Sequence, residues 1–215
     1  MKILKKFTSI PSLETLLALN PSTRALLFDM DGTIFHSEPI HALAMQELGK
    51  HYKIIPPITP EEVHKLLVGK ADHLVFDLIK EWPSFPKHLT LEKFVSEKND
   101  ILVSLIPGHR EKMLHPSIEL IFKEARALNI HMAIVTSSEK VVTYRLVEEL
   151  QVKDHFDFIL TRNDCPLHKP HPWPYLKAVE KFGLKSHEVI VFEDSQVGME
   201  AALAAKCPTV QAAWY

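Results

Sequence analysis

The chain has 215 residues, of which 46% are hydrophobic and 24% charged, so it can build one substantial core or a core with a smaller appended domain. A formal net charge of −2 without a strip of basic residues argues against nucleic acid as a partner, and no run is apolar enough to cross a bilayer. Cys165 and Cys207 lack partners at metal-ligand spacing, which favours a reducing compartment, and we expect a cytoplasmic protein.

Residues 1–23 are predicted to be an extension that precedes the main fold. The extension begins with several lysines, but polar residues and a proline interrupt the stretch that follows, so no signal peptide is expected. Within it, a helical stretch is predicted near 12–19. The short apolar run 25–28 then ends abruptly at Asp29, which is typical of a buried parallel strand.

Residues 38–106 differ from the rest of the chain because apolar residues recur there at helical spacing. Proline clusters and a glycine separate four predicted helices, namely Pro39–His51, Thr59–Leu67, Ala71–Glu81 and Thr90–Leu105. We interpret this segment as a small all-helical domain inserted into a core that comprises residues 24–37 and 107–215.

After Pro116 the predicted elements alternate between helix and strand. The predicted helices are Ser117–Leu128, Glu139–Leu150, Trp173–Phe182 and Gln196–Ala205. The predicted strands are Met132–Val135, Phe156–Leu160, Val189–Phe192 and Thr209–Ala212. Such alternation predicts an α/β fold with a doubly wound parallel sheet, whose binding site lies at the carboxyl ends of the strands.

Two acids follow the first predicted strand at a spacing suited to phosphate chemistry. A turn that begins after Asp29 can direct its carboxylate at phosphorus and that of Asp31 at the departing oxygen, and Gly32 permits the tight backbone. Because anions meet there, a cation is needed, and Mg²⁺ prefers carboxylate, phosphate and water oxygens. Asp194, at a later strand end, is the natural second carboxylate ligand. Taken alone, the two acids would equally fit a simple turn after a strand.

The other predicted strand ends carry groups that suit a phosphoryl substrate. Thr136 is expected to bind phosphate with its side chain and Ser137 with its backbone amide. Ser138 is interpreted as a helix cap, since residues 136–139 also fit a capping box. Lys169 lies in a proline-rich loop that would hold its ammonium group in place, and the histidines beside it are interpreted as ordinary loop residues.

The last acidic pair, Glu193 and Asp194, precedes a predicted helix that either residue could cap. Ser195 can fill the capping role instead. We therefore expect Asp194 to ligate the metal and Glu193 to act indirectly or through water.

These segments resemble four motifs of the haloacid dehalogenase superfamily, in its phosphatase and phosphomutase branch with a helical cap. The first and second motifs match Phe28-Asp29-Met30-Asp31-Gly32-Thr33 and Thr136. The third and fourth match Lys169-Pro170 and Glu193-Asp194-Ser195 with Gly198. The likeness extends from about Ala25 onward and includes Ser37-Glu38-Pro39-Ile40-His41 and Tyr175-Leu176. It departs at Ser117 and Lys206, where glycine is common, and at His36, where aspartate is frequent.

The resemblance implies a Rossmann-like core with the helical insert as a cap that closes over the site. It implies that Asp29 is the nucleophile and Asp31 the general acid and base. The implied Mg²⁺ ligands are Asp29, the Asp31 carbonyl and Asp194. Thr33 and Glu193 are expected to support these ligands without binding the ion directly. The threonine and lysine of the second and third motifs would hold the phosphoryl oxygens.

Other functions share much of this pattern. A dehalogenase would use the same nucleophile but needs neither a second acid nor magnesium, which Asp31 and the acidic pair 193–194 argue against. A non-enzymatic binding protein on this fold would be expected to lack a catalytic group, and none is missing. A sugar phosphomutase is the main alternative, because it also passes through an aspartyl phosphate, and His41 weakly favours it.

Two residues in the insert and one that follows the second motif favour water as the phosphoryl acceptor. Sugar phosphomutases of this family typically carry cations where this chain has Val68, Asp72 and Glu139. His41 and Lys70 are the candidates for substrate contact, although ordinary packing would explain each equally well. The expected function is a Mg²⁺-dependent phosphatase that hydrolyses a small phosphorylated metabolite, such as a sugar phosphate, through an aspartyl phosphate.

Overall fold

The computed structural model describes residues 3–59, 61–63 and 72–215, and the chain divides into two compact units. The first unit contains Met1–His36 with Arg110–Tyr215, and the second contains Ser37–His109. Within the described residues, no helix is long and apolar enough to cross a bilayer.

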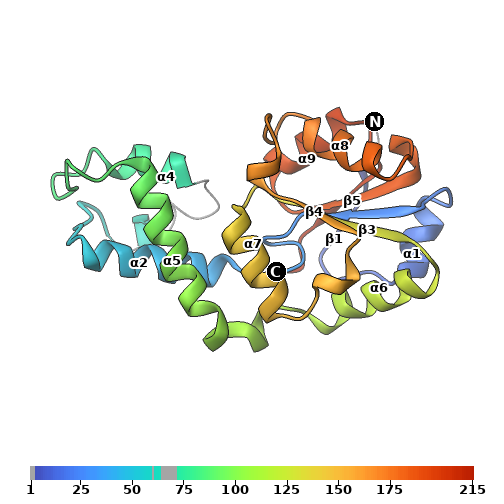
Figure 1. The fold of residues 1–215 in the computed structure, drawn as a ribbon, viewed down its shortest axis with the longest axis horizontal. Coiled ribbons are helices and arrows are strands. Elements are labelled where there is room, and N and C mark those ends of the chain that lie inside the picture. The colour runs from blue at the N-terminus through green and yellow to red at the C-terminus, as the bar shows by residue number, and fades with distance from the viewer. Residues whose placement is uncertain (1–2, 60, 64–71) are drawn as a thin grey trace. The chain divides into compact units, whose positions relative to one another are not determined.

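A sheet of six parallel strands forms the centre of the first unit, in the order β1-β6-β5-β2-β3-β4. The strands are β1 (Ile3–Phe7), β2 (Ala25–Phe28), β3 (His131–Val135), β4 (Phe158–Leu160), β5 (Val189–Glu193) and β6 (Thr209–Ala212). Helices α8 (Trp173–Lys181) and α9 (Gln196–Ala204) cover one face, and α1 (Leu13–Leu19) and α6 (Pro116–Ala127) the other (Figure 1). The arrangement confirms the predicted doubly wound α/β fold.

Strand β2 lies between β3 and β5, and all four of its residues are buried. Leu27 belongs to a core cluster that includes residues of α8 and α9. On the opposite face, Phe28 stacks on Phe192 and packs edge-on against Phe122 of α6. A strand covered on both faces is apolar throughout, so the first polar side chain at its carboxyl end is that of Asp29.

Residues 3–7 form a strand that the sequence analysis did not predict. Strand β1 pairs in parallel with β6 and extends the sheet at one edge, so part of the predicted extension belongs to the sheet. Its two central lysines are exposed, as is common on edge strands, where charge discourages pairing with other chains. Because of these lysines, the hydrophobic pattern of residues 3–7 does not predict a strand. The predicted helix does follow, as α1, with the Ser12 side chain accepting from the Thr15 N–H.

The remaining elements of the first unit agree with the predictions to within about two residues at most ends. Helix α7 spans Lys140–Glu149, and Ser195 caps α9 as predicted, its side chain accepting from the Gly198 N–H. Four short 3₁₀ turns complete the unit: η1 (Arg110–Lys112), η2 (Lys153–His155), η3 (Arg162–Asp164) and η4 (Ser186–Glu188).

The second unit is helical, with α2 (Glu38–His51), α4 (Asp72–Ile79) and α5 (Leu91–His109) around a small apolar core. That core contains Leu48, Val75, Ile79, Phe85, Leu89 and Phe94. The buried Lys98 on α5 donates to both carboxylate oxygens of Asp72 at 2.9 Å. The predicted helix Thr59–Leu67 falls largely outside the described residues, and Lys70 falls entirely outside them.

Candidate active site

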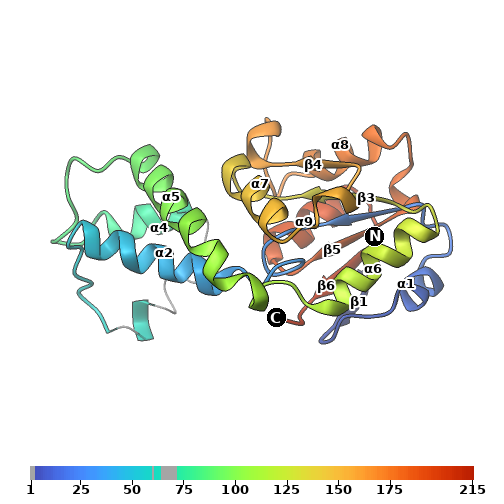
Figure 2. The same cartoon turned by 60° about the horizontal axis from the view of Figure 1, so that its bottom comes forward.

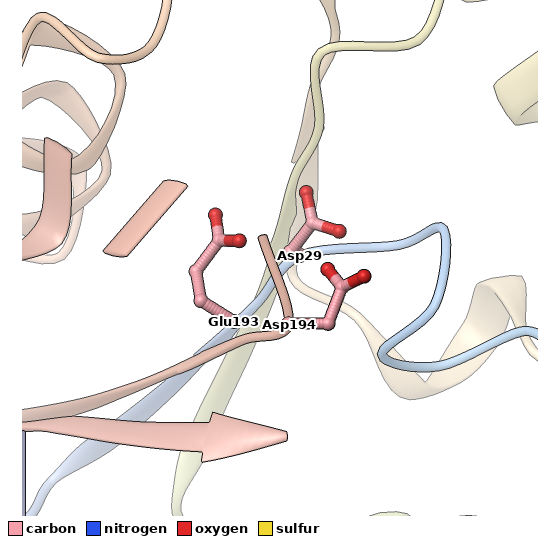
Figure 3. A group of neighbouring side chains, drawn as sticks. All are labelled: Asp29, Glu193 and Asp194. Atoms are coloured by element: carbon pink, nitrogen blue, oxygen red, sulfur yellow. The ribbon is translucent and has the colours of Figure 1, made fainter. Parts of the chain in front are cut away.

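Three neighbouring strands place their carboxyl ends at one edge of the sheet. The parallel register aligns Phe28 of β2 with Ile134 of β3 and with Phe192 of β5, so the residues that follow these strands meet. The side chains of Asp29, Glu193 and Asp194 project to the same side of this edge (Figure 3). The sheet therefore brings together residues that are more than 160 positions apart in the sequence.

Lys169 links two of these acids. Its Nζ donates to Asp29 Oδ1 at 2.7 Å, to Glu193 Oε1 at 2.5 Å and to the Val135 carbonyl at 2.8 Å. Only 3% of its side chain is exposed. Burial lowers the pKa of Lys169, but the adjoining Asp29 and Glu193 carboxylates outweigh burial and hold the pKa above its usual value. The ammonium group is therefore charged and fixed beside Asp29.

Glu193 is held from several directions. Tyr175 is fully buried and donates its hydroxyl to Glu193 Oε1, and Ser195 Oγ donates to Oε2 at 3.2 Å. A Cβ on Gly198 would lie 2.0 Å from the Glu193 carboxyl atoms, so a larger residue there would displace the carboxyl group. Both carboxylate oxygens of Glu193 thus accept hydrogen bonds, which come from the lysine, the tyrosine and the serine. Sequence reasoning assigned Tyr175 no role, because nothing near it in the sequence indicates a carboxylate partner at the end of β5.

Burial and mutual repulsion disfavour the charged forms of the two aspartates. Burial raises the pKa of Asp29 well above its usual value, with Lys169 opposing this and Glu193 and Asp194 adding to it. Burial, reinforced by Glu193, raises the pKa of Asp194 to about 7. A cation at this edge would stabilise both aspartates in their ionised forms.

The carboxylates fit a hard divalent cation. Asp29, Glu193 and Asp194 each offer an oxygen, and these oxygens lie within 4.8 Å of one another. Because Glu193 is already hydrogen-bonded on both oxygens, Asp29 and Asp194 are the better placed to ligate a metal. One or two carboxylates completed by substrate and water oxygens are the ligand set that Mg²⁺ prefers.

Asp31 lies on a compact turn beside this edge. The N–H groups of residues 33–35 all donate to the Met30 carbonyl, and the Gly32 N–H donates to the Phe35 carbonyl at 2.8 Å. Gly32 has a φ of +74°, and a Cβ there would lie 2.2 Å from Asp194 Oδ2. The turn therefore depends on glycine for both its conformation and its proximity to Asp194.

The prediction that Ser138 is a helix cap is wrong. The N-cap of α7 is Glu139, which makes no side-chain cap bond. Ser138 Oγ instead donates to Asp31 Oδ2 at 2.5 Å, and its N–H donates to Thr136 Oγ1 at 3.0 Å. Asn163 caps the helix by accepting from the Lys140 N–H. The capping-box spacing misled because a serine can donate to a distant carboxylate as readily as it can cap.

The other predicted residues are distributed between the two units. Thr136 is buried at the end of β3 and Ser137 is exposed next to it. Thr33 Oγ1 donates weakly to Asp194 Oδ1 at 3.5 Å. His41 lies on α2, in the second unit, and is half-buried.

Comparison with known proteins identifies the family of this chain. The model of the haloacid dehalogenase-like hydrolases matches residues 26–212. The chain belongs to the haloacid dehalogenase-like hydrolase family. This membership confirms the resemblance inferred from the four motifs.

Individual haloacid dehalogenase-like relatives are similar over most of their length. Fructose-1-phosphate phosphatase YqaB of Escherichia coli is 28% identical, with 84% of this chain and 91% of that protein covered. The crystal structure of CbbY from Rhodobacter sphaeroides in complex with phosphate is 23% identical, with a TM-score of 0.77 and 87% and 85% coverage. β-Phosphoglucomutase from Clostridium difficile is 25% identical, with a TM-score of 0.70 and 88% and 84% coverage.

Proposed function

We propose that this protein is a Mg²⁺-dependent phosphatase that hydrolyses a small phosphate monoester, such as a sugar phosphate, through an aspartyl phosphate on Asp29. The observation that carries the proposal is the contact of Asp29 with a buried, charged Lys169, with Asp31 on the next turn. Family membership supports hydrolase chemistry, and the name of the E. coli relative supports a sugar phosphate as the substrate class.

In the proposed first step, an Asp29 carboxylate oxygen attacks phosphorus and the bond from phosphorus to the ester oxygen breaks. Asp31, held by Ser138, gives its proton to the departing alkoxide. In the second step, Asp31 takes a proton from water, whose oxygen attacks the phosphoryl group and releases inorganic phosphate from Asp29. Lys169 and Thr136 are the proposed partners of the phosphoryl oxygens, together with the backbone amide of Ser137.

Asp29, Asp194 and the Asp31 carbonyl are the proposed ligands of Mg²⁺. When bound, the ion offsets the charge of the phosphoryl group and of the surrounding carboxylates. Thr33, through its contact with Asp194, and Glu193, through Lys169, keep the ligands and the lysine in position.

Removing a ligand should weaken the response to metal. Activity is expected to vanish with a chelator and to return with Mg²⁺, and Asp194→Ala should raise the Mg²⁺ concentration for half-maximal activity by ~10–100-fold. Titration of activity with Mg²⁺ in both proteins measures the shift. Asp77→Asn, which changes an exposed acid on α4, is the control. Full activity in metal-free buffer would remove the metal from the mechanism.

The second acid should matter most for poor leaving groups. Asp31→Asn removes the proton donor, a change typically worth ~10²–10⁴-fold. The loss in kcat/KM should be greatest for a sugar phosphate and smallest for p-nitrophenyl phosphate, whose leaving group needs no proton. Parallel assays with both substrates measure the difference, and equal losses would contradict the general-acid role.

A phosphomutase is the second candidate, because a β-phosphoglucomutase shares the fold at 25% identity. A mutase must hold the distal phosphate of a sugar bisphosphate with cations beyond Lys169. Asp72 and Glu139 replace two of the expected cations, and the Asp72 carboxylate already engages the buried Lys98. Neither position supplies a cation that would hold a second phosphate, so we favour water as the acceptor.

The products decide between these functions. The protein is incubated with Mg²⁺ and a panel of small monoesters that includes hexose phosphates, and inorganic phosphate is assayed. In parallel, β-glucose 1-phosphate with a bisphosphate primer is assayed for glucose 6-phosphate. We expect phosphate release without isomerisation. Rapid formation of glucose 6-phosphate without free phosphate would overturn the phosphatase proposal, and halide release from a haloacid would favour a dehalogenase.

A further inference from the structure

Two aromatic residues that follow β6 bind the turn that carries Asp31. Trp214 Nε1 donates to the Thr33 carbonyl at 3.0 Å, and the Tyr215 hydroxyl donates to the Ile34 carbonyl at 2.8 Å. The carbonyls of two consecutive residues of the turn thus both accept hydrogen bonds from one short segment. The N–H groups of the same turn donate inward to the Met30 carbonyl.

The Tyr215 hydroxyl also connects two stretches of chain. The chain leaves the first unit after His36 and returns to it at Arg110. On the first-unit side these stretches pair, since the His36 N–H donates to the Met113 carbonyl at 2.8 Å and Phe35 bridges to Leu114. The Tyr215 oxygen accepts from the His115 N–H at 3.2 Å while it donates to Ile34. One phenol therefore bridges both stretches.

Packing fixes the direction of the Tyr215 ring. The ring stacks on the His36 imidazole with centroids 5.1 Å apart and planes 18° apart. Burial raises the pKa of Tyr215, so the hydroxyl stays protonated and remains able to donate. Figure 2 shows the chain end that carries this ring beside the segment that leads into α6, in agreement with the bond to His115.

A backbone hydrogen bond to the edge strand of the sheet anchors residues 213–215. The Ala213 N–H donates to the Phe7 carbonyl of β1 at 2.9 Å, directly after β6 ends. Strand β1, which pairs along β6, thus fixes the position of the backbone directly before the two aromatic residues. A rigid strand is a better support for a positioned side chain than a free loop.

We propose that Trp214 and Tyr215 are positioning residues that hold the 30–35 turn, and through it Asp31, in the geometry needed for proton transfer. The proposal rests on the proposed function of Asp31. Proton transfer requires the donor within hydrogen-bond reach of the leaving oxygen, so a small displacement of the turn would slow this step selectively. Asp29 directly follows β2, before the turn, and is held by Lys169, so its attack would be affected less.

The test uses Tyr215→Phe, which removes the hydroxyl and keeps the ring, and Trp214→Phe, which removes the indole N–H. For a sugar phosphate, each is expected to lower kcat/KM, which reports the first phosphoryl transfer and not the later attack of water, by ~3–10-fold, as the loss of one hydrogen bond predicts. For p-nitrophenyl phosphate the loss should stay below ~2-fold, because that leaving group needs no proton. Tyr144→Phe on α7 removes a hydroxyl elsewhere and is the control.

A second measurement does not depend on activity. Amide hydrogen exchange is followed in peptides that cover residues 31–36, and both variants are expected to exchange faster there while the strands of the sheet are unchanged. Equal losses on both substrates with exchange as in the wild type would overturn the proposal. If the wild type hydrolyses no monoester, the proposed function and the role in proton transfer both fail, and the exchange data still decide whether these residues hold the turn.

Discussion

Asp29→Asn is expected to lower the turnover of phosphate monoesters by ~10⁴-fold or more while the protein remains folded. The amide keeps the size of the side chain but cannot attack phosphorus. Burial already raises the pKa of Asp29, so a neutral side chain at this position should cost the fold little. Lys169 keeps its bond to Glu193 in the variant, which preserves one partner for the buried ammonium group.

The measurement is kcat/KM for the purified variant, with circular dichroism and thermal unfolding as checks on the fold. Asp77→Asn removes an exposed carboxylate from α4 and should leave kcat/KM unchanged. A folded Asp29→Asn protein with a rate within ~10-fold of the wild type would show that another group is the nucleophile.

Gly32→Ala is expected to reduce activity by ~10²-fold or more and to destabilise the protein as well. The new Cβ would lie 2.2 Å from Asp194 Oδ2 and 2.8 Å from its Cγ, so the proposed metal ligand must move. A displacement of about 1 Å in a catalytic site can cost ~10²-fold in rate. The φ of +74° adds ~1–2 kcal/mol to the cost for a residue with a Cβ.

Gly183→Ala separates these two effects. Gly183 has a similar φ of +65°, but a Cβ there would meet no atom within 4 Å. This control should lose ~1–2 kcal/mol of unfolding free energy by denaturant titration and retain full activity. If Gly32→Ala lost no more activity than Gly183→Ala, the close approach to Asp194 would have no functional importance.

The fold was predictable because its central strands carry a strong local signal. Strand β2 is apolar throughout and ends at an acid, and helices of ordinary length separate the later strands. Parallel pairing then requires that the strand ends meet, so Asp29, Thr136 and Asp194 could be grouped from the sequence. Lys169 was included because its proline-rich loop follows a predicted strand and would hold the ammonium group in place, and in the structure this group contacts Asp29.

The features that escaped prediction depend on partners distant in the sequence. Ser138 contacts a carboxylate 107 positions away, and its place in the segment 136–139, which fits a capping box, suggests a cap just as well. Trp214 and Tyr215 reach carbonyls 181 positions away, and no pattern in the last residues indicates this. Strand β1 was missed because an exposed edge strand with two lysines has no hydrophobic alternation.

The central claim is that a phosphoryl group is transferred from the substrate to Asp29, and trapping the intermediate tests it most directly. The protein is mixed with Mg²⁺ and a ³²P-labelled monoester that it hydrolyses, quenched in acid within one turnover, digested and mapped by mass spectrometry. We expect label that is sensitive to hydroxylamine on the peptide that contains Asp29, and none in the Asp29→Asn protein. Steady hydrolysis with no label on this peptide, or label on another residue, would contradict the account.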